Sequence, residues 1–206
     1  MTGIIDYGVG NLFSLRSSLE AIGEQAVVSG DPALLHQADR LVLPGVGAFG
    51  DAAEKLRASG LDQLIRAEAA AGKPLLGICL GMQLLFEQSL EYGVHQGLGL
   101  LEGSVVPMEG VLPAELKIPH IGWNALHLVQ KDCPLFAGIR EGDYVYFVHS
   151  YYAENCGGAL AATAEYGIPL TAAVAGGSVY GCQFHPEKSG RVGLEILRAF
   201  SRLKGD

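Results

Sequence analysis

The first half of the chain alternates short apolar runs with longer segments whose apolar residues recur every three or four positions. Leu41-Val42-Leu43 is a continuous apolar run, as expected for a strand of a parallel sheet that is covered on both faces. Between Leu12 and Ile22, apolar residues follow the spacing of one face of a helix. This alternation predicts an α/β fold, a doubly wound and mostly parallel sheet flanked by helices. The predicted elements are strands at 4–6, 25–28, 41–43 and 74–78 and helices at 12–22, from Asp31-Pro32 onward, at 49–58, at 61–71 and at 82–87.

The second half of the chain has short apolar runs with little helical spacing between them. These runs predict antiparallel or mixed strands that are added to the parallel core. The expected strands are at 100–107, 125–129, 144–148, 160–164, 170–175 and 179–183, followed by a final amphipathic helix at 189–203. No repeat, low-complexity tract or linker interrupts this pattern, so we expect one domain over residues 1–206.

Composition narrows the class of protein. Hydrophobic residues make up 49% of the 206 residues and charged residues 17%, which supplies a sizeable core. The formal charge of −8 argues against nucleic-acid or membrane-surface partners, because both attract basic proteins. No segment approaches the roughly 20 apolar residues of a membrane span, and the N-terminus lacks the basic segment and cleavage site of a signal peptide. Four cysteines are too few for a disulfide framework, so we expect a reducing, cytoplasmic location.

A cysteine between two glycines is the most distinctive chemical feature. The run Gly77-Ile78-Cys79-Leu80-Gly81 lies between the strand predicted at 74–78 and the helix predicted at 82–87. This is the elbow G-x-nucleophile-x-G with Cys in place of Ser, and its glycines permit a sharp turn. A helix start behind the sulfur favours the thiolate. A free cysteine is also common as a small buried hydrophobe. Ligands of open α/β sheets bind at the carboxyl ends of strands, however, and this position favours a nucleophile.

A base and an orienting carboxylate follow the last predicted strand. His185 and Glu187 are two residues apart in an extended stretch, which places both side chains on one side of the backbone. Glu187 could therefore hold one ring nitrogen of His185 while the other nitrogen faces Cys79. Cys182 and His185 could also be read as a pair of metal ligands. No second closely spaced Cys/His pair accompanies them, so we expect neither a metal site nor a cofactor.

A glycine-rich run follows the strand predicted at 41–43. Gly45-Val46-Gly47-Ala48-Phe49-Gly50 matches the dinucleotide fingerprint G-x-G-x-x-G. We reject that interpretation because the run follows a late strand, Pro44 stiffens its turn, and the next strand ends in Cys79 where a ribose-binding acid is expected. We interpret it instead as a loop whose backbone N–H groups stabilise an oxyanion beside the nucleophile, a contribution of about 3 kcal/mol for each donor.

Taken together, the elbow, Gln83 behind it and the late His185-x-Glu187 resemble the triad class of glutamine amidotransferases. Pro44-Gly45-Val46-Gly47 resembles the Pro-Gly-x-Gly strand of that class. Over essentially its whole length, the chain is similar to one family within it, the glutaminase subunits of imidazole glycerol phosphate synthase. The segments that carry this closer resemblance are 6–12, 44–50, 117–124 and 146–151.

The resemblance implies a specific chemistry. The Cys79 thiolate attacks the side-chain amide of glutamine, and backbone N–H groups of Leu80 and of the strand Gly45, Val46 and Gly47 bind the oxyanion. His185 protonates the leaving ammonia and then activates the water that hydrolyses the γ-glutamyl thioester, while Glu187 orients His185. The resemblance also implies that the substrate contacts are Gln83, Ser150 and Tyr151.

The resemblance further implies a partner. Released ammonia would pass to a (β/α)₈-barrel cyclase, which forms a heterodimer with this chain and combines ammonia with phosphoribulosyl-formimino-carboxamide ribonucleotide. The products would be imidazole glycerol phosphate and aminoimidazole carboxamide ribonucleotide, in histidine biosynthesis. We place Lys117, His120 and Trp123 near this partner, because a tryptophan with proline and glycine neighbours suits an interface anchor. The same segment could be a loop with a core tryptophan. His149 is interpreted as structural.

Three alternatives remain open from the sequence. The chain could serve another triad amidotransferase, act alone as a γ-glutamyl hydrolase or peptidase, or be a non-catalytic scaffold. We also expect the glutaminase to be weak without the partner, because a strand with glycines on both sides of Val46 could rest in an unproductive orientation and flip when the loaded partner is present.

Overall fold

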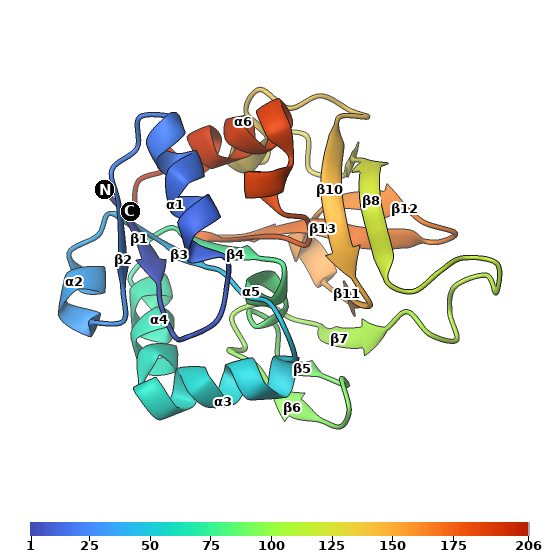
Figure 1. The fold of residues 1–206 in the computed structure, drawn as a ribbon, viewed down its shortest axis with the longest axis horizontal. Coiled ribbons are helices and arrows are strands. Elements are labelled where there is room, and N and C mark those ends of the chain that lie inside the picture. The colour runs from blue at the N-terminus through green and yellow to red at the C-terminus, as the bar shows by residue number, and fades with distance from the viewer. Residues whose placement is uncertain (206) are drawn as a thin grey trace.

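Within residues 1–205, which the computed structural model describes, the central sheet has eight strands, and five of them are parallel (Figure 1). The last residue of the predicted domain, Asp206, lies outside the described residues. The parallel strands lie in the order β2 (Ala26–Ser29), β1 (Thr2–Ile5), β3 (Arg40–Leu43), β4 (Leu75–Ile78) and β14 (Val179–Cys182). The predicted α/β fold class with a mostly parallel sheet is confirmed.

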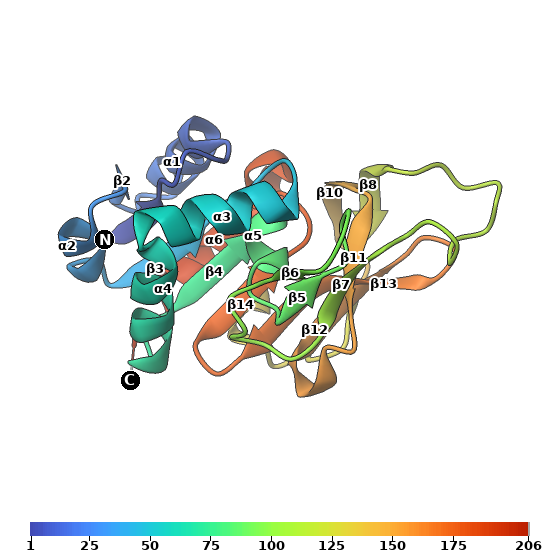
Figure 2. The ribbon, with the colours of Figure 1, turned by 90° about the horizontal axis from the view of Figure 1, so that it is seen from below.

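Helices cover both faces of the parallel strands. Neighbouring residues of a strand point to opposite faces of the sheet, so a strand of consecutive apolar residues has apolar side chains on both faces. In β3, Leu41 and Leu43 belong to one hydrophobic core and Val42 to the other. Helices α1 and α6 cover one face, and α3 and α4 lie across the other (Figures 1 and 2). None of the helices in this part of the chain has the length and apolar character needed to cross a bilayer. The helices are α1 (Leu12–Ala21), α2 (Pro32–His36), α3 (Phe49–Ser59), α4 (Leu61–Ala70), α5 (Leu80–Gln83) and α6 (Gly190–Ser201).

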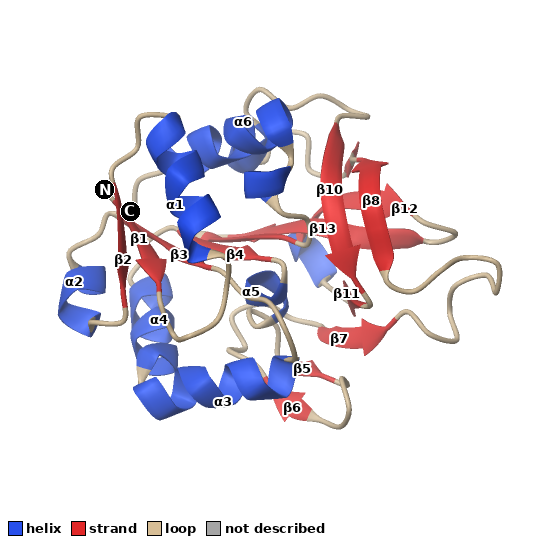
Figure 3. Ribbon diagram, in the orientation of Figure 1, coloured by secondary structure: helices blue, strands red, loops and turns tan. Residues whose placement is uncertain are grey.

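Strands dominate the second half, as predicted, and they gather on the side of the molecule away from the two termini (Figure 3). Three of them extend the central sheet beyond β14 in antiparallel order, and the others form two smaller sheets. The extending strands are β13 (Pro169–Gly176), β12 (Leu160–Glu165) and β9 (His127–Leu128). The smaller sheets pair β10 (Tyr144–His149) with β8 (His120–Ala125), and join β11 (Tyr151–Glu154), β7 (Ser104–Pro107), β5 (Gln88–Ser89) and β6 (His95–Gln96).

Two predicted elements are shorter in the structure. The helix predicted at 82–87 begins earlier and ends at Gln83, because the N–H groups of Leu85 and Phe86 bond three residues back and close turns instead of continuing the helix. The strand predicted at 100–107 begins only at Ser104. Gly103 precedes it with φ +120°, a backbone conformation outside the strand region.

The segment around residue 122 is a strand and not a loop. Residues 120–125 form β8, whereas the prediction placed a strand at 125–129, which the structure divides between the end of β8 and the short β9. Gly122 and Pro119 conceal this strand in the sequence, since both residue types are depleted in strands. Strands β5, β6 and β11 were also not predicted, and two of them have only two residues.

Candidate active site

Cys79 occupies a strained turn between β4 and α5. Its φ of 54° and ψ of −112° are unusual for a residue with a side chain. The flanking glycines are required by space, since a Cβ on Gly77 would lie 2.6 Å from the carbonyl oxygen of Gly81, and one on Gly81 would lie 1.8 Å from that of Leu43. The predicted elbow is therefore present, and close packing of β3 against it explains the glycine spacing.

His185 and Glu187 follow β14, the strand that pairs with β4 in the central sheet. Nδ1 of His185 lies 2.8 Å from Oε1 of Glu187, and both side chains are 3% exposed. Burial by itself lowers the pKa of His185, but the contacts with Cys79 and Glu187 outweigh it and raise that pKa to about 9. The imidazole is therefore protonated near pH 7, and a cationic histidine beside a cysteine is typical of thiolate nucleophiles.

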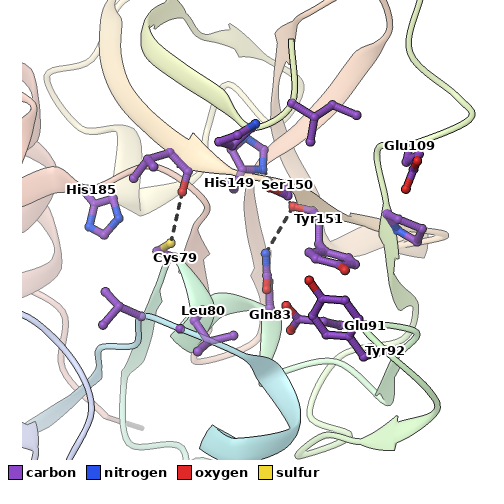
Figure 4. A pocket seen from close by; sticks show the side chains of 16 residues that line it. Cys79, Leu80, Gln83, Glu91, Tyr92, Glu109, His149, Ser150, Tyr151 and His185 are labelled. Atoms are coloured by element: carbon purple, nitrogen blue, oxygen red, sulfur yellow. Dashed lines mark hydrogen bonds between the residues drawn. The ribbon is translucent and has the colours of Figure 1, made fainter.

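A cavity of about 530 Å³ opens at this point (Figure 4). Cys79 and His185 lie at one end of it, and Glu91, Tyr92 and Glu109 lie at the other, with Gln83 between them. The volume is in the range of small-molecule sites. One end of the cavity can therefore hold a reacting group while the acidic end holds a positive charge.

The expected oxyanion residues adjoin the nucleophile. Val46 and Gly47 line the cavity, as does Leu80, which begins α5 and so has one of the N–H groups without a partner inside the helix. Gly45 packs against the elbow, where a Cβ would lie 2.8 Å from the nitrogen of Gly81. The hydroxyl of Tyr7 donates to the carbonyl oxygen of Pro44 at 2.8 Å, which anchors the start of this strand.

The expected substrate residues also meet at the cavity. Ser150 and Tyr151 line it, and Nε2 of Gln83 donates to the carbonyl oxygen of Tyr151 at 3.2 Å. The same nitrogen donates to Oε1 of Gln183 at 2.9 Å, and Nε2 of Gln183 lies 3.8 Å from Sγ of Cys79. Gln183 was not predicted as a site residue, although its spacing of two residues from His185 on an extended segment could have indicated it.

Glu91 is a second residue that the sequence analysis missed. It is 9% exposed, and its Oε2 accepts the N–H of Phe49 at the start of α3 at 2.5 Å. Glu91 lies between β5 and β6, in a stretch for which the sequence predicts no element, and no local motif marks it. Among residues 1–205, no group of three or more His, Cys, Asp or Glu side chains is arranged as metal ligands.

The three residues expected near a partner lie in different environments. Trp123 is 54% exposed on β8, so it is not the core residue of the alternative interpretation. Lys117 is also exposed, just before that strand. His120, by contrast, is 3% exposed and stacks between Phe147 and Tyr166, so its ring is not on the exposed side of β8. Alternation along β8 places it on the covered side.

Comparison with known proteins agrees with this geometry. Residues 3–202 match the family described as glutamine amidotransferase class-I. The imidazole glycerol phosphate synthase subunit HisH of Bacillus licheniformis is 53% identical over 98% of this chain and 96% of its own, and that of Oceanobacillus iheyensis is 48% identical over 98% and 99%. A crystal structure of a glutamine amidotransferase superposes with a TM-score of 0.74 at 20% identity, covering 97% of this chain and 98% of the other, which supports the fold. The chain therefore belongs to the class-I glutamine amidotransferases and, within them, to the family of HisH subunits of imidazole glycerol phosphate synthase.

Proposed function

We propose that the chain hydrolyses glutamine to glutamate and ammonia at Cys79, as the glutaminase half of imidazole glycerol phosphate synthase. The observation that carries the proposal is the position of Cys79 next to His185 at one end of the cavity, with Glu187 bonded to the other ring nitrogen. A nucleophile, a base and an orienting carboxylate are the groups that acyl transfer through a covalent intermediate needs.

The geometry supports a two-stage reaction. The Cys79 thiolate adds to the side-chain amide carbon of glutamine, and the N–H groups of Leu80 and of the strand Gly45–Gly47 receive the oxyanion. His185 gives its proton to the leaving nitrogen, so ammonia departs and a γ-glutamyl thioester remains. The neutral His185 then takes a proton from the water that attacks the thioester. Glutamate leaves, and the Cys79 thiolate and the protonated His185 are restored.

The far end of the cavity suits the amino-acid head of glutamine. The carboxylates of Glu91 and Glu109 line it, and a carboxylate is the natural partner of an α-ammonium group. Glu91 is held in place by the N–H of Phe49, so its orientation is fixed before the substrate arrives. Gln83, Ser150 and Tyr151 lie along the path between this end and Cys79.

We propose that the partner is a (β/α)₈-barrel cyclase, which forms a cytoplasmic heterodimer with this chain. Ammonia released into water becomes ammonium, which has no free lone pair, so transfer needs a docked synthase. In and next to the β8–β10 pair, Ile121 is 59%, Trp123 54% and Tyr144 58% exposed. A group of exposed apolar side chains of this kind marks an interaction surface, and Lys117 adjoins it.

We also propose that residues 1–206 work as one amidotransferase domain.

The glycine-flanked Val46 is 45% exposed, and a Cβ on Gly47 would meet no atom within 4 Å, so space is available for the predicted reorientation of this strand. Equal glutaminase rates with and without the ligand-loaded cyclase would exclude that reorientation.

The test is glutamine hydrolysis by the chain alone and together with a histidine-pathway cyclase and its nucleotide. Added hydroxylamine should trap the thioester as γ-glutamyl hydroxamate. We expect strong stimulation by the cyclase, and we expect Cys79→Ala to abolish both glutamate and hydroxamate. Cys156→Ala, which changes another buried cysteine, should retain both.

Other results identify the alternatives. Glutaminase activity that survives in Cys79→Ala contradicts the mechanism. Efficient hydrolysis of γ-glutamyl peptides without a partner indicates a stand-alone hydrolase, and stimulation only by another synthase indicates a different triad amidotransferase.

A further inference from the structure

Two buried histidines, His120 on the covered side of β8 and His149 on β10 at the wall of the cavity, have no role in the mechanism above. His120 and His149 are opposite each other across the β8–β10 pair and are 3% and 6% exposed. Nδ1 of His120 lies 3.0 Å from Nε2 of His149. The rings of Phe147 and Tyr166 stack with that of His120 at centroid distances of 4.9 and 4.2 Å. Both imidazoles are therefore held in one orientation.

The groups at the two ends decide which ring nitrogens carry protons. Nδ1 of His149 lies 2.8 Å from the carbonyl oxygen of Tyr151, which can only accept, so this nitrogen donates. Nε2 of His120 lies 3.3 Å from Nδ2 of Asn124, which can only donate, so this nitrogen accepts. The bond between the rings must then run from Nδ1–H of His120 to Nε2 of His149, and both rings are neutral.

The surroundings support this proton arrangement. Oδ1 of Asn124 accepts the N–H of Ala125 at 2.8 Å, and its Nδ2 also donates to the carbonyl oxygen of Glu165 at 2.8 Å, so the amide cannot be reversed. Burial lowers the pKa of His120 to about 4. Burial lowers the pKa of His149 to about 3, although the bond to the carbonyl oxygen of Tyr151 acts in the opposite direction. Both rings are neutral near pH 7.

The far end of this chain of bonds reaches the nucleophile. The carbonyl oxygen of Tyr151 also accepts Nε2–H of Gln83, and the second hydrogen of that nitrogen goes to Oε1 of Gln183. Nε2 of Gln183 in turn lies within hydrogen-bond distance of Sγ of Cys79. Since both N–H groups of Gln83 are engaged, only its Oε1 remains to meet a ligand in the cavity (Figure 4).

We propose that His120 and His149 are positioning residues. Their two neutral imidazoles form a relay, a chain of hydrogen bonds that connects β8 to the glutamine cavity. The relay fixes the carbonyl group of Tyr151 and, through it, the side-chain amide of Gln83. Ile121 and Trp123 are exposed on the other side of β8, so a partner that displaces this strand also moves the relay. The inference rests on the proposed function, because it takes Gln83 as a contact of glutamine.

The test is a double-mutant cycle on the complex with the cyclase. His120→Phe preserves the stacked ring and removes both nitrogens, so it breaks the relay at its end farther from the cavity. We expect the KM for glutamine to rise about 10-fold, as for loss of a buried hydrogen bond, with kcat changed less than about twofold. In a Gln83→Ala background, the same substitution should change KM less than about twofold, because the two residues act in series. An additive rise in KM would overturn the proposal.

Matched controls separate the relay from packing. Tyr166→Phe keeps the ring on His120 and loses only the bond from its hydroxyl to the carbonyl oxygen of Lys117, so KM should not change. A rise in KM equal to that of His120→Phe would show that loss of a bond outside the relay has the same effect, and it would overturn the proposal. Nitrogen-15 NMR of labelled histidine in the unaltered protein tests the relay without any variant. We expect both rings to be neutral with the proton on Nδ1 at pH 7.

A proton on Nε2 of either ring would contradict the relay, even if glutamine hydrolysis proceeds as proposed. Conversely, glutaminase activity that survives Cys79→Ala would contradict the proposed function, and the NMR result would still report on the relay. The two failures are therefore distinguishable.

Discussion

At the residue scale, the charge state of His185 depends on its spacing of two residues from Glu187. An extended step of two residues brings the Glu187 carboxylate to one ring nitrogen, and the sheet brings Cys79 to the other side of the ring. Burial opposes the charge on the imidazole, and the two neighbours more than offset it. The result is a histidine that keeps its proton at neutral pH and can release it to a leaving group.

This charge state predicts a pH dependence of stability. Between pH 6.5 and about 9, His185 holds a proton in the folded state that it releases on unfolding. The free energy of unfolding should therefore be highest below pH 6.5 and fall as the pH rises through 9. Glu187→Gln removes one cause of the raised pKa, so urea unfolding between pH 6 and 9.5 should show a shallower decline.

Glu141→Gln is the matched control, because Glu141 pairs with the exposed His127 at the same 2.8 Å distance, where solvent screens the interaction. Its pH profile should match that of the unaltered protein. An unchanged slope in Glu187→Gln would show that the carboxylate does not support the His185 charge.

The proposed triad could be predicted at this scale because each of its signals is local. Cys79 lies between glycines at fixed spacing, and His185 and Glu187 share one short extended segment. Glu91 could not be assigned in the same way, because its bond to Phe49 spans 42 residues. Gln183 shares the extended segment of His185, but that spacing does not reveal its bonds to Gln83 and Cys79, which span 100 and 104 residues. No local pattern records such contacts.

At the element scale, the elbow depends on how closely β3 approaches the start of α5. Gly81 lies against the carbonyl oxygen of Leu43, where a Cβ would be 1.8 Å away. Backbone atoms cannot swing aside as a side chain can. The cysteine turn is thus determined jointly by its own strand and by the neighbouring strand.

Gly81→Ala should therefore destabilise the protein by at least about 2 kcal/mol, since overpacking against backbone forces α5 away from β3. Glutaminase activity should be lost with it. The measurement is the free energy of unfolding in urea. Gly158→Ala serves as the control, because a Cβ there meets no atom within 4 Å, and it should change stability by less than about 0.5 kcal/mol. Equal effects of the two substitutions would contradict the steric explanation.

Helices and parallel strands of the first half were predictable because burial on both faces and helical spacing leave strong patterns. The strand β8 was not predictable, because Gly122 interrupts the pattern of strand-favouring residues in the sequence and pairing with β10 stabilises the strand. The helix behind Cys79 was overestimated, because the apolar residues that follow Gln83 are buried in turns and not along a helix face.

At the scale of the whole molecule, the helices lie at one end and the added strands at the other (Figures 1 and 3). Residues of both parts line the cavity, among them Cys79 and Tyr151. The exposed apolar side chains of β8 lie on the strand-rich part. Ile118 and Pro119, which precede β8, line the same cavity as Cys79, so the proposed partner surface adjoins the proposed site of ammonia release.

Removal of these side chains should weaken docking of the cyclase. We expect Ile121→Ala and Trp123→Ala each to raise the Kd about 10-fold or more, as for anchors at the centre of an interface. Titration calorimetry with the cyclase measures this. Leu34→Ala is the control, because Leu34 is 44% exposed on α2 at the opposite end of the molecule (Figure 1). An equal loss of affinity for Leu34→Ala would argue against β8 as the docking surface.

The α/β class and the proposed triad could be predicted from the sequence, because both depend on short-range patterns: hydrophobic periodicity and glycine spacing around Cys79. The tertiary structure established which residues complete the cavity and which face outwards. It buried His120, exposed Trp123 and brought Glu91 to the far end of the cavity. Those outcomes depend on strand pairing between distant segments, and the free energy of such pairing resides in contacts that no local stretch of sequence contains.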